Sequence, residues 1–153
     1  CKARRIPCIF DPGQSLPMLN AKELLQAING CIILISNDYE LDLIMSKTAL
    51  TKSQLLERTG TIITTLGDQG SRICSLQGET AIPAIKPREV VDPTGAGDSY
   101  RGGLITGLAR GLDIAQSALM GSVCASFAVE CYGTQEYAFS REEFENRLNE
   151  RSS

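Results

Sequence analysis

The sequence predicts an α/β protein in which a parallel sheet is covered by helices. Over residues 6–66, short apolar runs alternate with segments of helical character, in the order strand, helix, strand, helix, strand. The apolar runs are continuous, which is typical of strands buried on both faces of a parallel sheet. The 153 residues, 42% of them apolar, can bury one core, so one domain over residues 1–153 is expected.

The first strand is predicted at residues 6–11, a β-branched and apolar run. A helix then begins after Asn20, because Asn20 and Glu23 have the spacing of a capping box, and it ends near Asn29. The second strand, residues 31–36, is fully apolar until its last residue. These three elements form the first strand–helix–strand unit of the predicted sheet.

A short helix is expected to begin at Asn37, directly after the second strand. Thr51 and Gln54 form another capping-box pattern, which predicts a helix that runs to Arg58. The third strand, residues 61–66, is rich in β-branched residues.

The second half of the chain changes pattern. Residues 71–76 and 80–85 flank a turn and predict an antiparallel hairpin at the edge of the sheet. Two helices are expected at residues 97–110 and 113–130. A last, polar helix is predicted after the capping box that Ser140 opens.

The first of these two helices carries Gly103, Gly107 and Gly111, spaced every four residues. Each interior glycine costs about 1 kcal/mol against alanine, so a close neighbour is expected on this face. The next helix is the predicted neighbour, because small residues allow close approach. Its small residues are Ala118, Gly121, Ser122, Ala125 and Ala128.

Composition excludes several classes of protein. A net charge of −3 argues against a nucleic-acid-binding surface, and no apolar run is long enough to cross a membrane. A cytoplasmic protein is therefore expected. The chain has no His, so it cannot form a Ser-His-Asp catalytic triad by itself. Its six cysteines lack Cys-x-x-Cys spacing, so neither a zinc site nor a disulfide framework is expected.

The most informative stretch is Gly95, Ala96, Gly97 and Asp98, where a loop becomes a helix. Small residues leave backbone N–H groups uncovered, and the helix adds unpaired N–H groups and the positive end of its dipole. This arrangement predicts a phosphate cradle with a carboxylate beside it. The alternative is that Asp98 only caps the helix and the glycines only turn the chain.

Residues 92–103 resemble the second signature of the ribokinase/PfkB family, in which Asp-Thr-x-Gly-Ala-Gly-Asp precedes a small residue and an aromatic one. Pro93 departs from the pattern at a position where Thr or Ser is commoner, and its rigid φ is compatible with a fixed loop. The resemblance includes other segments and is strongest to bacterial adenosine kinases and related sugar kinases. These segments are residues 10–14, 37–40, 65–71 and 133–137.

The resemblance implies a three-layer ribokinase-like sandwich with a mostly parallel central sheet. It also implies that residues 1–153 are the C-terminal, nucleotide-binding half of a kinase domain, with the N-terminal half and the lid absent. The chain is about half as long as members of that family and begins at Cys1. Alone, it is expected to be inactive, because the acceptor pocket lies upstream.

The resemblance assigns roles at the cradle. The amides of Gly95, Ala96 and Gly97 form an anion hole, and Asp98 acts as the catalytic base. Asn37 contributes to the nucleotide site, and Glu40 holds Mg²⁺ through water. The spacing of Asn37 and Glu40 is also that of a capping box, and the two roles can coexist.

Thr65, Gly67 and Gly70 follow the third strand, where the resemblance implies contact with the nucleotide. By itself this segment is a glycine-rich turn, for which a linker is an equal alternative. The resemblance further implies that Asp92 helps to hold a monovalent cation such as K⁺.

The chain is predicted to belong to an ATP- and Mg²⁺-dependent kinase that phosphorylates a hydroxymethyl group of a nucleoside. Adenosine is the first acceptor expected. The alternatives are a ribokinase-like sugar kinase and a nucleotide-binding half-domain without turnover. The expected partners are small-molecule substrates, with no nucleic acid and no membrane, and a homodimer of the full-length protein.

Overall fold

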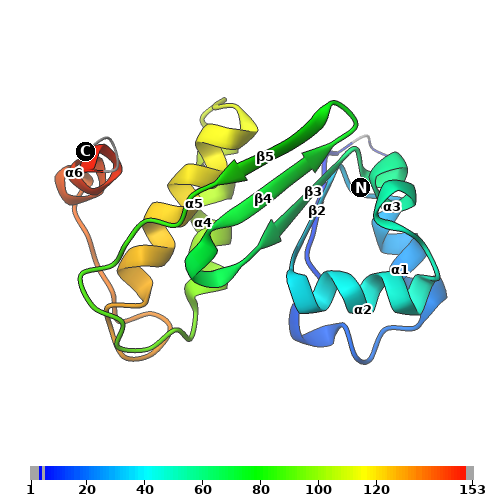
Figure 1. Cartoon of the computed structure of the whole chain (residues 1–153), viewed down its shortest axis with the longest axis horizontal. Helices are drawn as coiled ribbons and strands as arrows, with labels where there is room; N and C mark the ends of the chain where they lie inside the picture. The colour runs from blue at the N-terminus through cyan, green and yellow to red at the C-terminus, as the bar shows by residue number, and fades with distance from the viewer. Residues whose placement is uncertain (1–3, 5, 151–153) are drawn as a thin grey trace. The chain divides into compact units, whose positions relative to one another are not determined.

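The structure is a computed structural model that describes residue 4 and residues 6–150 of the chain. Cys1 lies outside the described residues. Residue contacts divide the chain into two compact units. Unit 1 comprises residues 1–66 and 72–80, and unit 2 comprises residues 67–71 and 81–153. Figure 1 shows the order of the elements along the chain.

Five strands form one sheet in the order β1-β2-β3-β4-β5. The pairs β1/β2 and β2/β3 are parallel, as predicted. β4 and β5 are joined by only two residues and lie at one edge of the sheet, which confirms the hairpin. The strands are β1 (Ile9–Phe10), β2 (Ile33–Asn37), β3 (Thr61–Thr65), β4 (Ser71–Ser75) and β5 (Gly78–Ile82).

Three helices of unit 1 follow the predicted capping boxes: α1 (Ala21–Ile28), α2 (Asp38–Thr48) and α3 (Lys52–Thr59). In each, the side chain of the N-cap residue accepts the N–H three residues later, and that residue's side chain accepts the N-cap N–H. The helices pack onto β2 and β3 through one apolar cluster (Figure 1). Its fully buried members include Leu24, Ile28, Leu34, Ile44, Leu55 and Ile62.

Two predicted strands differ from the structure next to a proline. β1 has two residues instead of six, because Pro7 has no N–H for the ladder and Ile6 is half exposed. β5 ends at Ile82, directly before Pro83, for the same reason. The prediction of a strand through residue 85 was therefore wrong.

In unit 2, α4 (Ala96–Ala109) and α5 (Ile114–Ala128) pack closely through their small residues. A Cβ at Gly103 would lie 2.7 Å from the carbonyl oxygen of Met120, and one at Gly121 would lie 2.7 Å from that of Tyr100. The predicted close approach is confirmed. Gly111 is an exception, because it lies just after α4 and its φ of +79° is typical of a glycine that ends a helix.

Substitution of Gly103 by alanine tests this close approach. We expect Gly103→Ala to lower the free energy of unfolding by about 1–3 kcal/mol, because the added methyl meets backbone that cannot move aside. Gly102→Ala is the matched control, since nothing lies within 4 Å of its Cβ position and alanine is the better helix former. Urea denaturation measures both variants, and equal stabilities would contradict the packing.

The last helix, α6 (Arg141–Glu150), is mostly polar, as predicted, but two of its apolar residues and one arginine reach the core of unit 2. Phe144 and Leu148 pack against a cluster centred on Ile85, Val123 and Phe127. Arg147 is buried as well, and its guanidinium stacks 3.5 Å from the ring centroid of Phe127. It pairs with Glu130. Burial alone would raise the pKa of Glu130, but the hydrogen bonds from Arg147 and from the Arg88 backbone N–H, together with the charges of both arginines, outweigh burial and lower it.

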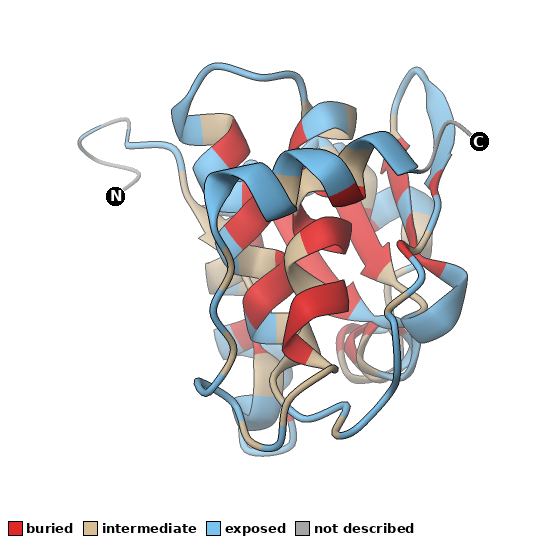
Figure 2. Cartoon of the chain, turned by 90° about the vertical axis from the view of Figure 1, so that its left-hand side faces the viewer, coloured by how far each residue is buried: buried red, intermediate tan, exposed pale blue. Residues whose placement is uncertain are grey.

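Figure 2 shows that buried residues are concentrated in helices and strands and that the connecting loops are mostly exposed. None of the helices among residues 6–150 is long and apolar enough to cross a bilayer. Of the cysteines in the described part of the chain, Cys31 and Cys74 are buried and Cys8, Cys124 and Cys131 are half-buried, all as free thiols.

Candidate active site

The loop that enters α4 forms the centre of the candidate site. Gly95 is the N-cap of α4 and has φ +84°, a conformation that favours glycine. No side chain caps the helix at this end. Among the described residues, the N–H groups of Gly95, Gly97 and Asp98 have no hydrogen-bond partner. Three amides and the helix dipole are thus available to an anion, as the sequence predicts for this segment.

Ala96 differs from the other predicted members of the anion hole. Its N–H donates to the carbonyl of Pro93 at 3.2 Å and closes a turn. Gly95 is the third residue of this turn, and its φ of +84° and ψ of −6° are those that a type II turn requires of a glycine there. In this conformation the unpartnered amides of the turn are those of Gly95, Gly97 and Asp98, and the anion hole at Gly95, Ala96 and Gly97 stays a prediction.

Asp92 fixes this loop by accepting hydrogen bonds from two backbone N–H groups. One carboxylate oxygen accepts the N–H of Thr94 at 2.9 Å, and the other accepts that of Gly133 at 3.0 Å. Hydrogen bonds from the Thr94 side chain, then from the backbone of Thr94 and Gly133, lower the pKa of Asp92. Both oxygens serve backbone amides, so the role of Asp92 as a monovalent-cation ligand stays a prediction.

A second segment, distant in the sequence, lies against the cradle. A Cβ at Gly95 would lie 3.1 Å from the Cα of Thr134, a tight contact that glycine avoids. Ser99, one residue after Asp98, donates its hydroxyl to the Tyr137 hydroxyl at 2.9 Å. The roles of Thr134 and Tyr137 were missed from the residues alone, although the Gly-Thr-Gln-Glu-Tyr motif was their signal.

Asp98 stands in the first turn of α4 with 83% of its side chain exposed. Its Oδ1 accepts a hydrogen bond from Nη1 of Arg101 at 2.9 Å. The carboxylate thus lies beside the cradle in an open position, where a substrate hydroxyl can reach it. This geometry suits a base that acts on an acceptor bound next to a phosphate.

Tyr100 is the other ionisable group of this turn, and it is structural. It is 4% exposed, and its hydroxyl lies 2.7 Å from Oγ of Ser71. Burial raises its pKa to about 12, against a smaller lowering effect of Ser71. Tyr100 therefore stays protonated near neutral pH and is not a candidate base.

The two glycines of the turn after β3 differ in their surroundings. Gly70 has φ +87°, and a Cβ there would overlap the carbonyl of Ile82 and the backbone of Ala84. Gly70 is therefore required by the turn itself. Gly67 also has positive φ, but its Cβ position is open, so it is the better candidate for contact with a nucleotide.

In unit 1, the structure brings three predicted residues together at the carboxyl ends of parallel strands. Asn37 and Thr65 are register partners at the ends of β2 and β3. Glu40 lies in the first turn of α2, where its Oε2 accepts the N–H of Asn37 at 2.9 Å. The carboxyl ends of parallel strands are where α/β proteins bind ligands.

The donor set at Glu40 fits Mg²⁺ held through water. The hydrogen bond from the Asn37 N–H engages Oε2 of Glu40. Mg²⁺ keeps several waters and needs only one or two carboxylates besides substrate phosphates. Within the described residues, no three Cys, Asp or Glu side chains gather into a closed metal cage. The role of Glu40 in holding Mg²⁺ therefore stays a prediction.

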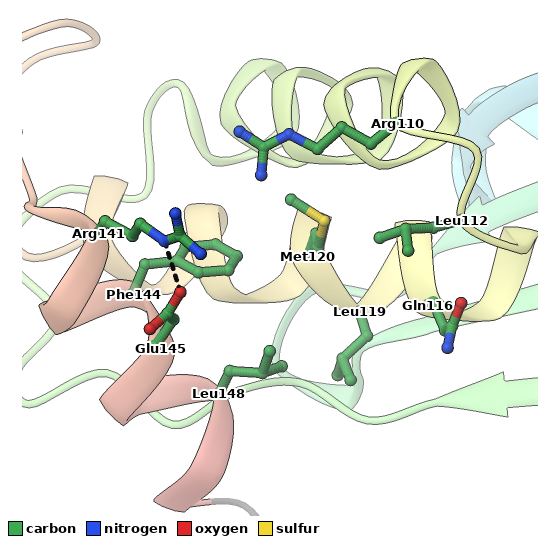
Figure 3. Close-up of a pocket in the computed structure, with 9 residues that line it drawn as sticks. All are labelled: Arg110, Leu112, Gln116, Leu119, Met120, Arg141, Phe144, Glu145 and Leu148. Atoms are coloured by element: carbon green, nitrogen blue, oxygen red, sulfur yellow. Dashed lines mark hydrogen bonds and ion pairs between the residues drawn. The ribbon is translucent and has the colours of Figure 1, made fainter.

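A groove of about 740 Å³ lies elsewhere in unit 2, between the end of α4, α5 and α6 (Figure 3). Leu119, Met120, Phe144 and Leu148 line it, and Arg110 reaches over Met120. Arg110 is twelve residues beyond Asp98, about 18 Å along the helix. None of the predicted site residues lines this groove, so it is not the predicted catalytic site.

Comparison with known proteins agrees with this geometry. The chain matches the family model described as pfkB family carbohydrate kinase over residues 1–140. It is 45% identical over 127 residues to a nucleoside kinase of Methanothermobacter thermautotrophicus, and the match covers 82% of this chain and 40% of that protein.

The fold is similar to that of a nucleoside kinase from Burkholderia thailandensis, solved in complex with inosine and with ADP-inosine. In both comparisons the TM-score is 0.92, the identity is 35% and 95% of this chain is covered, against 49% and 46% of the two solved chains. The chain thus spans about half the length of these relatives. Its sheet, its glycine-rich loop before α4 and its family match over 140 residues agree, and the chain belongs to the PfkB family of carbohydrate kinases.

Proposed function

We propose that this chain supplies the nucleotide-binding and catalytic part of a kinase that transfers the γ-phosphate of ATP to a hydroxymethyl group of a nucleoside. The observation that supports it best is the first turn of α4. There, the unpartnered amides of Gly95 and Gly97 stand next to the exposed carboxylate of Asp98. A phosphate and a hydroxyl can be bound side by side at this turn.

In the proposed mechanism the amides of Gly95, Gly97 and Asp98 hold the transferred phosphoryl group. Each such donor is worth about 2.7–4 kcal/mol where removal has been measured in other enzymes. Asp98 orients the acceptor hydroxyl and takes its proton late, because phosphoryl transfer passes through a loose transition state. Mg²⁺, when bound, neutralises the charge of the phosphates, and Glu40 and Asn37 would hold its water shell.

Adenosine is the first acceptor that we propose, and inosine is the second, since the Burkholderia thailandensis relative binds inosine. A sugar acceptor is the alternative, supported by the family's description as carbohydrate kinases. The test is transfer of ³²P from labelled ATP to adenosine, inosine and ribose by the complete protein that carries this chain. Transfer to ribose alone would make it a sugar kinase, and no transfer to any acceptor would favour a binding function.

Glu40 gives a separate test of the magnesium role. We expect Glu40→Gln to raise the Mg²⁺ concentration needed for half-maximal rate, because glutamine keeps the cap but loses the charge that orders the metal's waters. Glu23→Gln is the matched control, since Glu23 closes the same capping box on α1 at 2.9 Å. A Mg²⁺ titration of the rate measures both variants.

The two variants should keep nearly the same stability, since glutamine can close each capping box as glutamate does. If Glu40→Gln and Glu23→Gln also have the same Mg²⁺ requirement as the wild-type protein, Glu40 is only a capping residue.

A further inference from the structure

Arg101 lies on α4 three residues after Asp98, so the two side chains share one face of the helix. Nη1 of Arg101 donates to Oδ1 of Asp98 at 2.9 Å. The two side chains differ in exposure, at 27% for Arg101 and 83% for Asp98. Arg101 is therefore the anchored member of the pair, and Asp98 is the member that the pair restrains.

The guanidinium of Arg101 also covers Gly97. A Cβ at Gly97 would lie 2.9 Å from Nη1 and 3.7 Å from Cζ of Arg101. Any larger residue at position 97 would displace the guanidinium. Gly97 therefore has a role besides its free amide, because it leaves the space in which Arg101 reaches Asp98.

We infer that Arg101 is a positioning residue for Asp98, an inference that rests on the proposed function. Arg101 holds Oδ1, so that Oδ2 can accept the hydrogen bond of the acceptor hydroxyl. The bond from the γ-phosphorus to the bridging oxygen breaks as the hydroxyl oxygen forms its bond to that phosphorus, Oδ2 takes the hydroxyl proton late in this step, and ADP leaves. Arg101 remains bound to Oδ1 throughout and exchanges no proton.

The physical need for such a residue follows from the exposure of Asp98. An exposed aspartate populates several χ1 rotamers, of which only some point a carboxylate oxygen at the acceptor. A planar guanidinium restrains the carboxylate more strictly than a flexible ammonium group does. Misplacement of a reacting group by about 1 Å can cost about 100-fold in rate.

The test compares variants of the complete protein that carries this chain. We expect Arg101→Gln to lower kcat by about 10- to 100-fold and to leave the KM for ATP nearly unchanged. Arg101→Lys should recover part of the rate, because it restores the charge but not the planar contact. Arg141→Gln is the matched control, since Arg141 forms an exposed ion pair with Glu145 on α6, and it should behave as wild type.

The double variant Asp98→Asn/Arg101→Gln identifies the route of action. If Arg101 acts through Asp98, its loss should cost little further kcat in the Asp98→Asn background. Equal losses in both backgrounds, or a tenfold rise in the KM for ATP, would show that Arg101 acts on the nucleotide and would overturn the inference.

Two further outcomes separate this inference from the proposed function. If Asp98→Asn is inactive and Arg101→Gln turns over as fast as Arg141→Gln, the inference is wrong and the proposed function stands. If Asp98→Asn itself turns over at the wild-type rate, the proposed function is wrong. Thermal unfolding of each variant shows whether a lost rate reflects a lost fold. If Arg101→Gln does not fold, the kcat of Arg101→Lys tests the inference in its place.

Discussion

Asp98→Asn should lower kcat of the complete protein by at least about 10²-fold, the low end for a positioned general base. Asparagine has nearly the same shape, and its carbonyl oxygen can still accept the hydrogen bond from Arg101. It cannot take a proton from the acceptor. The KM for ATP and the melting temperature should therefore change little, because the amides of Gly95 and Gly97 are untouched.

Asp113→Asn is a matched control for this substitution. Asp113 is also an aspartate at the start of a helix, where its side chain caps α5 by accepting the N–H of Gln116 at 2.8 Å. Asparagine is an equally good N-cap residue, so stability and rate should both be retained. Wild-type turnover by Asp98→Asn would mean that Asp98 is only a helix-end residue like Asp113.

Arg147→Ala should produce the largest loss of stability, about 3–5 kcal/mol, which is typical when one partner of a buried ion pair is removed. The Arg147 side chain is 6% exposed, and its guanidinium contacts Glu130 at 2.9 Å and stacks on Phe127. Its loss leaves the Glu130 carboxylate, 15% exposed, without its cation. Urea denaturation of the complete protein measures the change.

Arg141→Ala on the same helix is the control. Arg141 pairs with Glu145 at 2.6 Å, but 91% of the Arg141 side chain is exposed, so the loss should be at most about 1 kcal/mol. A similar, small effect of both substitutions would show that α6 contributes little to the stability of unit 2.

Elements with strong local signals were predicted well from the sequence. The four capping boxes that begin at Asn20, Asn37, Thr51 and Ser140 fix the starts of their helices, because the reciprocal hydrogen bonds involve only residues three apart. The strand ends at Pro7 and Pro83 were misjudged, since the apolar pattern was given more weight than the missing N–H. The polar character of α6 was predicted correctly, but the burial of Arg147 was not predicted, because it depends on Phe127 and Glu130, far away in the sequence.

At the candidate site, too, features set by neighbouring residues were predictable, and contacts between segments distant in the sequence were not. The free amides at Gly95 and Gly97 follow from local residue types, and the sequence predicts them. The turn that engages the N–H of Ala96, and the approach of Thr134 to Gly95, depend on backbone geometry that no spacing pattern reveals. Arg101 and Asp98 are three residues apart, so their contact is compatible with helical spacing. The position of the Arg101 guanidinium over Gly97 can be seen only in the structure.

The central claim is that the first turn of α4 holds the transferred phosphate beside Asp98. The most direct measurement is a crystal structure of the complete protein with Mg²⁺, adenosine and a non-hydrolysable ATP analogue. We expect γ-phosphate oxygens about 3 Å from the amide nitrogens of Gly95 and Gly97, and the adenosine hydroxymethyl oxygen within hydrogen-bond distance of the Asp98 carboxylate. Phosphates bound away from this turn, or an acceptor hydroxyl out of reach of Asp98, would contradict the account.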